Sequence, residues 1–235
     1  MKPRNAYLEN MRGSTMFKLI VSYQNGPWSD GCSVRSLNLA IKLMQRILPH
    51  AEIHVTTQAP LQELPSVIYH QQESLYSHGR FCQPLDINLH RLHCENDHIL
   101  WMLPPAVNRW LARNDATLAW LVDWDYYGNY AERVGGFRAC PGMYGLPPGL
   151  VMPMPPLEER GDDQSEQGFV ASWLREHPPH EIVTHDEVSC YMPNHDILKH
   201  THSKVGTCGV HLAGLNRGWS AGGEKLLGEL EKMYL

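Results

Sequence analysis

The chain has 235 residues, a length that suits one domain of ordinary to large size with its own hydrophobic core. Hydrophobic residues make up 43% of it and charged residues 19%, which is typical of a globular protein and excludes a largely disordered one. A formal net charge of -5 without a long run of lysine or arginine argues against binding of bulk nucleic acid.

The composition also bears on location. No apolar stretch approaches the length of a membrane-spanning helix, and residues 1–15 are polar, without the apolar centre of a secretion signal. We expect residues 1–235 to form one domain that begins with this polar extension. The six cysteines include no CxxC pair, so we expect free thiols and a cytoplasmic protein.

The first third of the chain has the pattern of a βαβ unit. Residues 16–23 are an apolar run of strand formers that ends in a loop signal. Residues 34–48 carry apolar side chains on one helical face and are followed by Pro49. Residues 52–56 alternate between polar and apolar. The two strands are therefore expected to be parallel, joined by a right-handed crossover.

The middle of the chain is less regular. Between residues 57 and 95 we expect one or two short strands and a connecting helix, and residues 98–113 have a helical period interrupted by two prolines. Residues 116–122 are almost continuously apolar, which predicts a central strand buried on both faces.

The rest of the chain is expected to be mainly loops. Residues 135–156, rich in glycine and proline, are interpreted as a long ordered loop system that excludes an inner strand. We expect a flexible surface loop at 161–168, a strand at 181–184 and an amphipathic helix at 223–234. That helix is expected to point Leu226, Leu227, Leu230 and Met233 inward.

A pair of carboxylates directly follows the predicted central strand. Asp123 and Asp125 are one residue apart, and ligands of open α/β sheets bind beyond the carboxyl ends of the strands. Two such carboxylates can converge on Mg²⁺ or Mn²⁺ and leave positions free for phosphate oxygens. The alternative is a solvated turn without a ligand.

A second feature runs from His211 to Trp219. His211 is a candidate metal ligand. Gly214 would allow the ligand to approach the backbone closely, and the planar guanidinium of Arg217 would donate two hydrogen bonds to a phosphate. The alternative is a strand followed by a glycine-rich turn.

Together these features resemble the retaining glycosyltransferases of the glycogenin type. In that family a DxD pair and a late HxxGxxKPW segment hold Mn²⁺ against a nucleotide diphosphate. Here Arg217 stands at the lysine and Gly218 at the proline of the motif. The resemblance implies a GT-A-like α/β fold with a mostly parallel twisted sheet and flanking helices. It also implies a UDP-sugar donor, Mn²⁺ or Mg²⁺ at Asp123, Asp125 and His211, and transfer with retention.

A third segment, His185-Asp186-Glu187, is similar to the HDES segment of the blood-group-type α1,3-glycosyltransferases. That resemblance implies that Glu187 is the catalytic carboxylate, although Val188 stands where the family has serine. The alternative is an acidic loop at the end of a strand.

Further candidates follow from their positions. Asp97, in the turn Glu95-Asn96-Asp97, is expected to bind hydroxyls of the donor sugar or to cap a helix. The nucleoside and phosphate are expected to meet the end of the first strand and the start of the first helix, at Tyr23, Gln24, Asn25 and Arg35. His195, His200 and His202 form a local cluster whose spacing matches no zinc pattern.

Two other functions remain open at this stage. The chain is either a transferase for an unknown acceptor, a nucleotide-sugar-binding protein of the same ancestry that transfers nothing, or a metal-dependent hydrolase built on the same aspartates and histidine.

Overall fold

A computed structural model describes most of the chain. The described residues are 19–25, 31–58, 61–72, 85–122, 137–154, 163–192, 204–213 and 221–235. Every structural statement below concerns these ranges.

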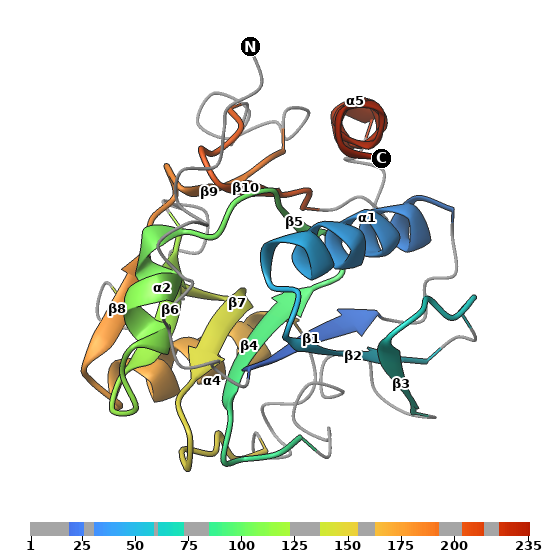
Figure 1. Cartoon of the computed structure of the whole chain (residues 1–235). Coiled ribbons are helices and arrows are strands. Elements are labelled where there is room, and N and C mark those ends of the chain that lie inside the picture. Colours follow the sequence, from blue (N-terminus) through green and yellow to red (C-terminus); the bar gives the residue numbers. More distant parts are fainter. Residues whose placement is uncertain are drawn as a thin grey trace.

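The centre of the molecule is a seven-stranded sheet with the order β3-β2-β1-β4-β7-β6-β8 (Figure 1). Its strands are β1 (Leu19–Asn25), β2 (Glu52–Thr57), β3 (Val67–Gln71), β4 (His90–Glu95), β6 (Thr117–Leu121), β7 (Ala139–Leu146) and β8 (His180–Val183). Only β7 runs antiparallel to its neighbours β4 and β6. The other pairs are parallel, so all strands except β7 end at one edge of the sheet.

Helices cover both faces of this sheet. Helix α1 (Gly31–Ile47) lies over β1, β2 and β4, α5 (Ala221–Tyr234) lies beyond α1, and α4 (Asp163–Arg175) covers the opposite face near β7 (Figure 1). A large core fills the α1 side and a smaller one fills the α4 side. Among the described residues, no helix is long and apolar enough to cross a membrane.

The predicted βαβ unit is confirmed by β1, α1 and β2, with β1 and β2 parallel. The predicted central strand is confirmed as β6. Leu118 and Trp120 point into the larger core, whereas Ala119 belongs to the smaller one. A strand between two cores needs apolar side chains at every position, which explains the unbroken apolar run. Of the helical pattern predicted over residues 98–113, only Pro105–Leu111 forms a helix, α2. It starts at a proline, a residue suited to the first helical position.

The prediction of a loop system over residues 135–156 was wrong for β7, an inner strand buried along its whole length. Its glycines make room for neighbours, since a Cβ on Gly145 would come within 2.7 Å of Cζ2 of Trp110. Pro141 falls where the ladder with β6 shifts register, so its missing N–H interrupts no regular pairing. In β7, the close approach of neighbouring side chains requires glycine, a residue that usually marks turns.

Two smaller expectations also need correction. Residues 163–168 begin α4 and are not part of a surface loop. In α5, Leu227 and Leu230 are buried as predicted and Leu226 packs on the core, but Met233 is 69% exposed. In the last turn of α5, Tyr234 packs against the core and stacks on Trp101, so Met233 faces outward.

A second, three-stranded sheet was not predicted. It has the order β5-β10-β9, formed by β5 (His98–Leu100), β10 (Gly209–His211) and β9 (Val188–Cys190). Strand β10 is antiparallel to β5 and parallel to β9. Three-residue strands carry too little periodicity to be recognised in a sequence.

Candidate metal and nucleotide site

The candidate site lies where the two sheets meet. Strand β4 ends at Glu95, a turn at Asn96 and Asp97 follows, and His98 opens β5 in the small sheet. The antiparallel register of β5 and β10 then places His211 opposite His98. A short turn therefore carries two carboxylates to the side of a histidine that is more than a hundred residues away in sequence.

Four side chains converge at this junction: Glu95, Asp97, His98 and His211 offer ligand atoms that all lie within 4.8 Å of one another. Nε2 of His211 lies 3.2 Å from Oδ1 of Asp97 and 3.7 Å from Oε2 of Glu95. Oδ1 of Asp97 is buried without a hydrogen-bond partner. Oδ1 of Asp97 and Nε2 of His211 are therefore close enough to be ligands of one cation.

The electrostatics of the cluster are dominated by Asp97 and His211. Burial alone would raise the pKa of Asp97, but the neighbouring His211 outweighs it and holds that pKa well below its usual range. Burial likewise lowers the pKa of His211, yet the carboxylate of Asp97 reverses this and raises the pKa above its usual value. The pair is therefore held as carboxylate and imidazolium, and a divalent cation would replace the proton between them.

His98 differs from the other three. Its ring is stacked on that of His211, with centroids 4.1 Å apart and planes 14° from parallel, and both rings meet the edge or face of Trp120. Burial and the nearby His211 lower the pKa of His98 to about 4, so it is neutral. Lone pairs of stacked imidazoles lie in parallel planes and do not converge on one ion. We therefore assign His98 a packing role and count Glu95, Asp97 and His211 as the donors.

Gly142 of β7 forms the floor of the cluster. A Cβ at this position would lie 2.5 Å from Cε1 of His98 and 3.2 Å from Oε2 of Glu95. No side chain other than hydrogen fits there without displacing these groups.

Gly142→Ala is therefore expected to lower the free energy of unfolding by about 1–3 kcal/mol, the usual cost of overpacking, and to disturb the cluster. Urea unfolding measures the first effect. Gly228→Ala on α5 is the control, because its nearest neighbour would be Arg35 at 3.9 Å. Removing a helical glycine there should stabilise by roughly 0.5–1 kcal/mol. Equal unfolding free energies for Gly142→Ala and the wild type would contradict the packing that we describe.

Two of the predicted nucleoside residues lie beside the carboxylate turn. Asn96 donates its backbone N–H to the carbonyl of Gln24 and its side-chain amide to Oδ1 of Asn25, at 2.8 Å. Asn25 also reaches Oγ1 of Thr57 at the end of β2. The side-chain amide of Gln24 is buried, and neither its oxygen nor its nitrogen has a hydrogen-bond partner among the described residues. Gln24 thus offers a free donor and a free acceptor close to the cluster.

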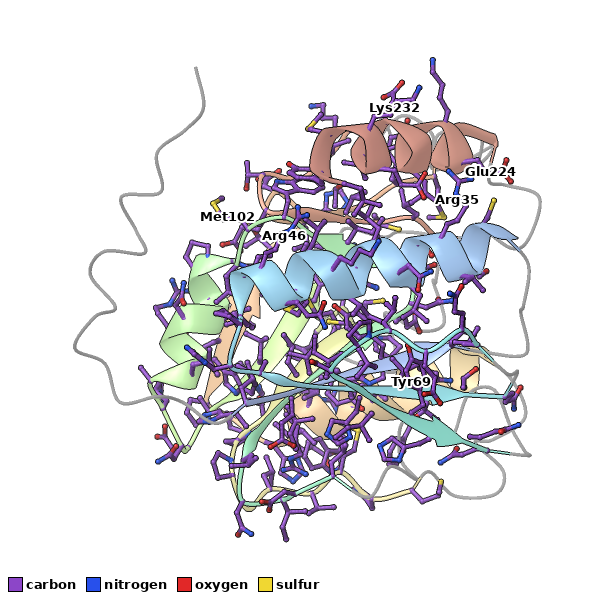
Figure 2. All side chains as sticks on the ribbon, turned by 45° about the vertical axis from the view of Figure 1, so that its right-hand side comes forward. Arg35, Arg46, Tyr69, Met102, Glu224 and Lys232 are labelled. Carbon is purple, nitrogen blue, oxygen red and sulfur yellow. The ribbon has the colours of Figure 1, made fainter. Side chains whose placement is uncertain are left out.

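Tyr23 and Arg35 do not fit their predicted roles. Tyr23 is 1% exposed, points into the core and reaches the carbonyl of Ala40, so it cannot stack on a base. Arg35 projects from α1 toward α5 (Figure 2) and forms a two-pronged ion pair with Glu231. Its guanidinium fastens the last helix to the first, which is a structural role.

Glu187 also has a local role. Its Oε2 accepts hydrogen bonds from the backbone N–H of Thr184 at 2.8 Å and from the hydroxyl of Thr184 at 3.2 Å. Glu187 precedes β9, whereas His211 is level with Cys190 at the other end of that strand. Three residues of strand separate them by about 10 Å. This geometry speaks against Glu187 as the catalytic carboxylate and favours its alternative reading as a turn residue.

Several predicted residues lie outside the described part of the chain: Asp123, Asp125, Gly214, Arg217, His195, His200 and His202. Their predicted roles stay predictions. Strand β6 runs in the same direction as β4 with β7 between them, so β6 ends at the same edge of the sheet as Glu95, about 10 Å away by the usual strand spacing.

Comparison with known proteins gives similarity at the level of structure. No family model matches the chain, and no curated protein matches its sequence. The galactosyltransferase LgtC, solved with donor and acceptor sugar analogues, superimposes with a TM-score of 0.55 at 13% identity, covering 92% of this chain and 96% of that one.

Two further glycosyltransferase structures are similar. The glycosyltransferase GlyE of Streptococcus pneumoniae TIGR4 gives a TM-score of 0.57 at 9% identity, over 91% of this chain and 60% of that one. A glycosyltransferase involved in glycosylation of the major capsid of PBCV-1 gives 0.51 at 11% identity, over 89% of this chain and 99% of that one. The predicted fold class is thus confirmed: this chain has the α/β fold of GT-A-type glycosyltransferases.

Proposed function

We propose that this chain is a metal-dependent glycosyltransferase that binds a nucleotide-sugar at the carboxyl edge of its main sheet. The observation that carries the proposal is the convergence of Glu95, Asp97 and His211 on one point at that edge. The fold adds support, because ligands of such sheets bind at this edge. The choice of UDP as the nucleotide and of retention of configuration is based on the resemblance of the sequence motifs to known glycosyltransferases. The sequence as a whole also resembles majastridin, a bacterial protein with a glycosyltransferase-like fold.

The donor set fits a divalent cation. Two carboxylates and one neutral imidazole supply oxygen and nitrogen ligands, a mixture that suits Mn²⁺ better than Mg²⁺. The 3.2 Å between Oδ1 of Asp97 and Nε2 of His211 supports this assignment. Glu95 and Asp97 have the carboxylate-x-carboxylate spacing that we predicted at Asp123 and Asp125, so the motif is present twice and its first copy lies beside His211.

The nucleotide is expected to lie between this cluster and the end of β1. Asn25 and Asn96 would hold the turn that presents the carboxylates, with the carbonyl of Gln24 accepting from the N–H of Asn96, and contact of the Gln24 side chain with the nucleoside stays a prediction. Arg217 and Gly214, which follow His211 in sequence, keep their predicted place beside the phosphates.

In the transfer, the bond between the anomeric carbon and the diphosphate breaks, and a bond to an acceptor oxygen forms. A cation bound by Asp97 and His211 would neutralise charge that develops on the leaving diphosphate. The carboxylates of Glu95 and Asp97 lie in a half-buried setting, where electrostatic interactions act more strongly than in water. Glu187 accepts hydrogen bonds from Thr184 within its own turn, and its role in stabilising the sugar in the transition state stays a prediction.

A ligand that binds only the native state raises the apparent stability in proportion to the logarithm of its concentration over Kd. UDP with Mn²⁺ is therefore expected to raise the melting temperature by about 5–11 °C at about one hundred times Kd, since roughly 2.7 kcal/mol is gained there and about 1 kcal/mol shifts the melting temperature of a domain this size by about 2–4 °C. EDTA should abolish the shift. A thermal-shift panel of nucleoside diphosphates measures this.

The same panel, together with assays for released UDP and phosphate, distinguishes the transferase from a binding protein and from a hydrolase. A shift with Mn²⁺ and UDP-sugar, but without release of UDP, would identify a binding protein that transfers nothing. Metal-dependent release of phosphate from simple esters, without a shift by any nucleotide diphosphate at millimolar concentration, would identify a hydrolase and overturn the proposal.

A further inference from the structure

The two ring nitrogens of His211 face different partners. Nε2 faces the carboxylates of Asp97 and Glu95, whereas Nδ1 lies 3.6 Å from the sulfur of Cys190. The thiol is buried and lies on the opposite edge of the ring from the proposed metal. Cys190 is not one of the four residues that converge as possible ligands among the described residues.

The backbone holds this contact in place. Strands β9 and β10 are parallel with Cys190 in register with His211, and the N–H of Tyr191 donates to the carbonyl of His211 at 2.8 Å. The N–H of Cys190 donates to Nε2 of His185 at 3.2 Å, which fixes the end of β9 from its other side. The sulfur is therefore built into the position beside Nδ1.

We infer that Cys190 is the positioning residue of the metal site, accepting a hydrogen bond from Nδ1–H of His211 so that Nε2 presents its lone pair to the cation. The inference rests on the proposed metal site. An imidazole that binds metal through Nε2 must carry its remaining proton on Nδ1, and that proton needs an acceptor when the ring is buried. The sulfur of Cys190 is the acceptor that the described residues place there.

The role predicts a specific pattern among variants. Cys190→Ala removes the acceptor and is expected to weaken Mn²⁺ binding by about 10–100-fold, the usual loss for a partner of a metal-binding histidine. Cys190→Ser keeps an acceptor on the same carbon and should recover most of the affinity. Cys208→Ala is the matched control. This substitution removes a similarly buried thiol from the segment leading into β10, where the sulfur contacts Thr207 and not His211. It should lose stability without losing affinity.

The experiment titrates the full chain with Mn²⁺ alone and follows the free ion by electron paramagnetic resonance, with His211→Ala as a reference. A second readout excludes a purely structural effect and direct ligation by sulfur. With Co²⁺ bound to the wild type, a positioning thiol gives no sulfur-to-metal charge-transfer band, whereas a ligating thiolate gives one.

The outcomes test the metal site and the role of Cys190 separately. If His211→Ala and the wild type take up Mn²⁺ equally, the metal site falls and the inference falls with it. If only His211→Ala loses Mn²⁺ while Cys190→Ala binds like the wild type, the site stands and the role of Cys190 is wrong. Equal losses in Cys190→Ser and Cys190→Ala, or a charge-transfer band, would also overturn that role.

Discussion

Asp97→Asn is expected to reduce Mn²⁺ affinity by at least about 100-fold, more than the loss of a partner behind a ligand, with little change in shape. The substitution keeps size and removes the charge that lies 3.2 Å from Nε2 of His211. A neutral amide oxygen is a weaker ligand than a carboxylate. Without that charge, the pKa of His211 loses the main influence that raises it.

Titration calorimetry with Mn²⁺, with and without UDP, measures the change. The control is Asp86→Asn, the same chemical change at an exposed carboxylate just before β4 whose oxygen accepts from the backbone N–H of Asn88. It should bind like the wild type. If Asp97→Asn keeps its affinity while Asp123→Asn or Asp125→Asn loses it, the carboxylates that bind the metal are the later pair.

His211→Ala should have an effect of similar size, whereas His98→Ala should change Mn²⁺ affinity less than about tenfold. Both rings are buried in the same stack with Trp120, and both truncations cost packing. Nε2 of His211 lies 3.2 Å from Oδ1 of Asp97, whereas Nδ1 of His98 lies 3.7 Å from the same oxygen.

Comparing the two variants separates a ligand from a packing partner. Urea unfolding in EDTA reports the packing loss of each, and calorimetry with Mn²⁺ reports the ligand. Equal losses of affinity would mean that His98 also binds the ion and would overturn the packing role that we assign to it.

The first βαβ unit and β6 could be predicted because their apolar patterns show their burial, whereas the GT-A-like fold class followed from the resemblance of the motifs to known glycosyltransferases. The central strand β4 has no such apolar pattern: His90, Arg91 and His93 make it look polar, although all three are buried. Nε2 of His90 donates to the carbonyl of Arg113, and Arg91 donates to the carbonyl of Pro147. Burial with such partners leaves no hydrophobic signal.

This is why the sequence directed attention to Asp123 and Asp125 after β6, whose role as metal ligands stays a prediction, and not to the carboxylates after β4. Glu95-Asn96-Asp97 has the same spacing as Asp123 and Asp125, but it follows a strand that looks polar, so a donor-sugar or capping role was the interpretation for Asp97. The spacing was a usable signal. What the sequence could not show is the small sheet, whose register alone places His211 next to Asp97.

The central claim is that Asp97 and His211 hold the metal that binds the nucleotide. Crystals grown with Mn²⁺ and UDP test it most directly through the anomalous scattering of manganese. The account predicts one peak within bonding distance, about 2.0–2.6 Å, of a carboxylate oxygen of Asp97 and of Nε2 of His211. A peak bound by Asp123 and Asp125 without Asp97, or no peak beside His211 at saturating Mn²⁺, would contradict it.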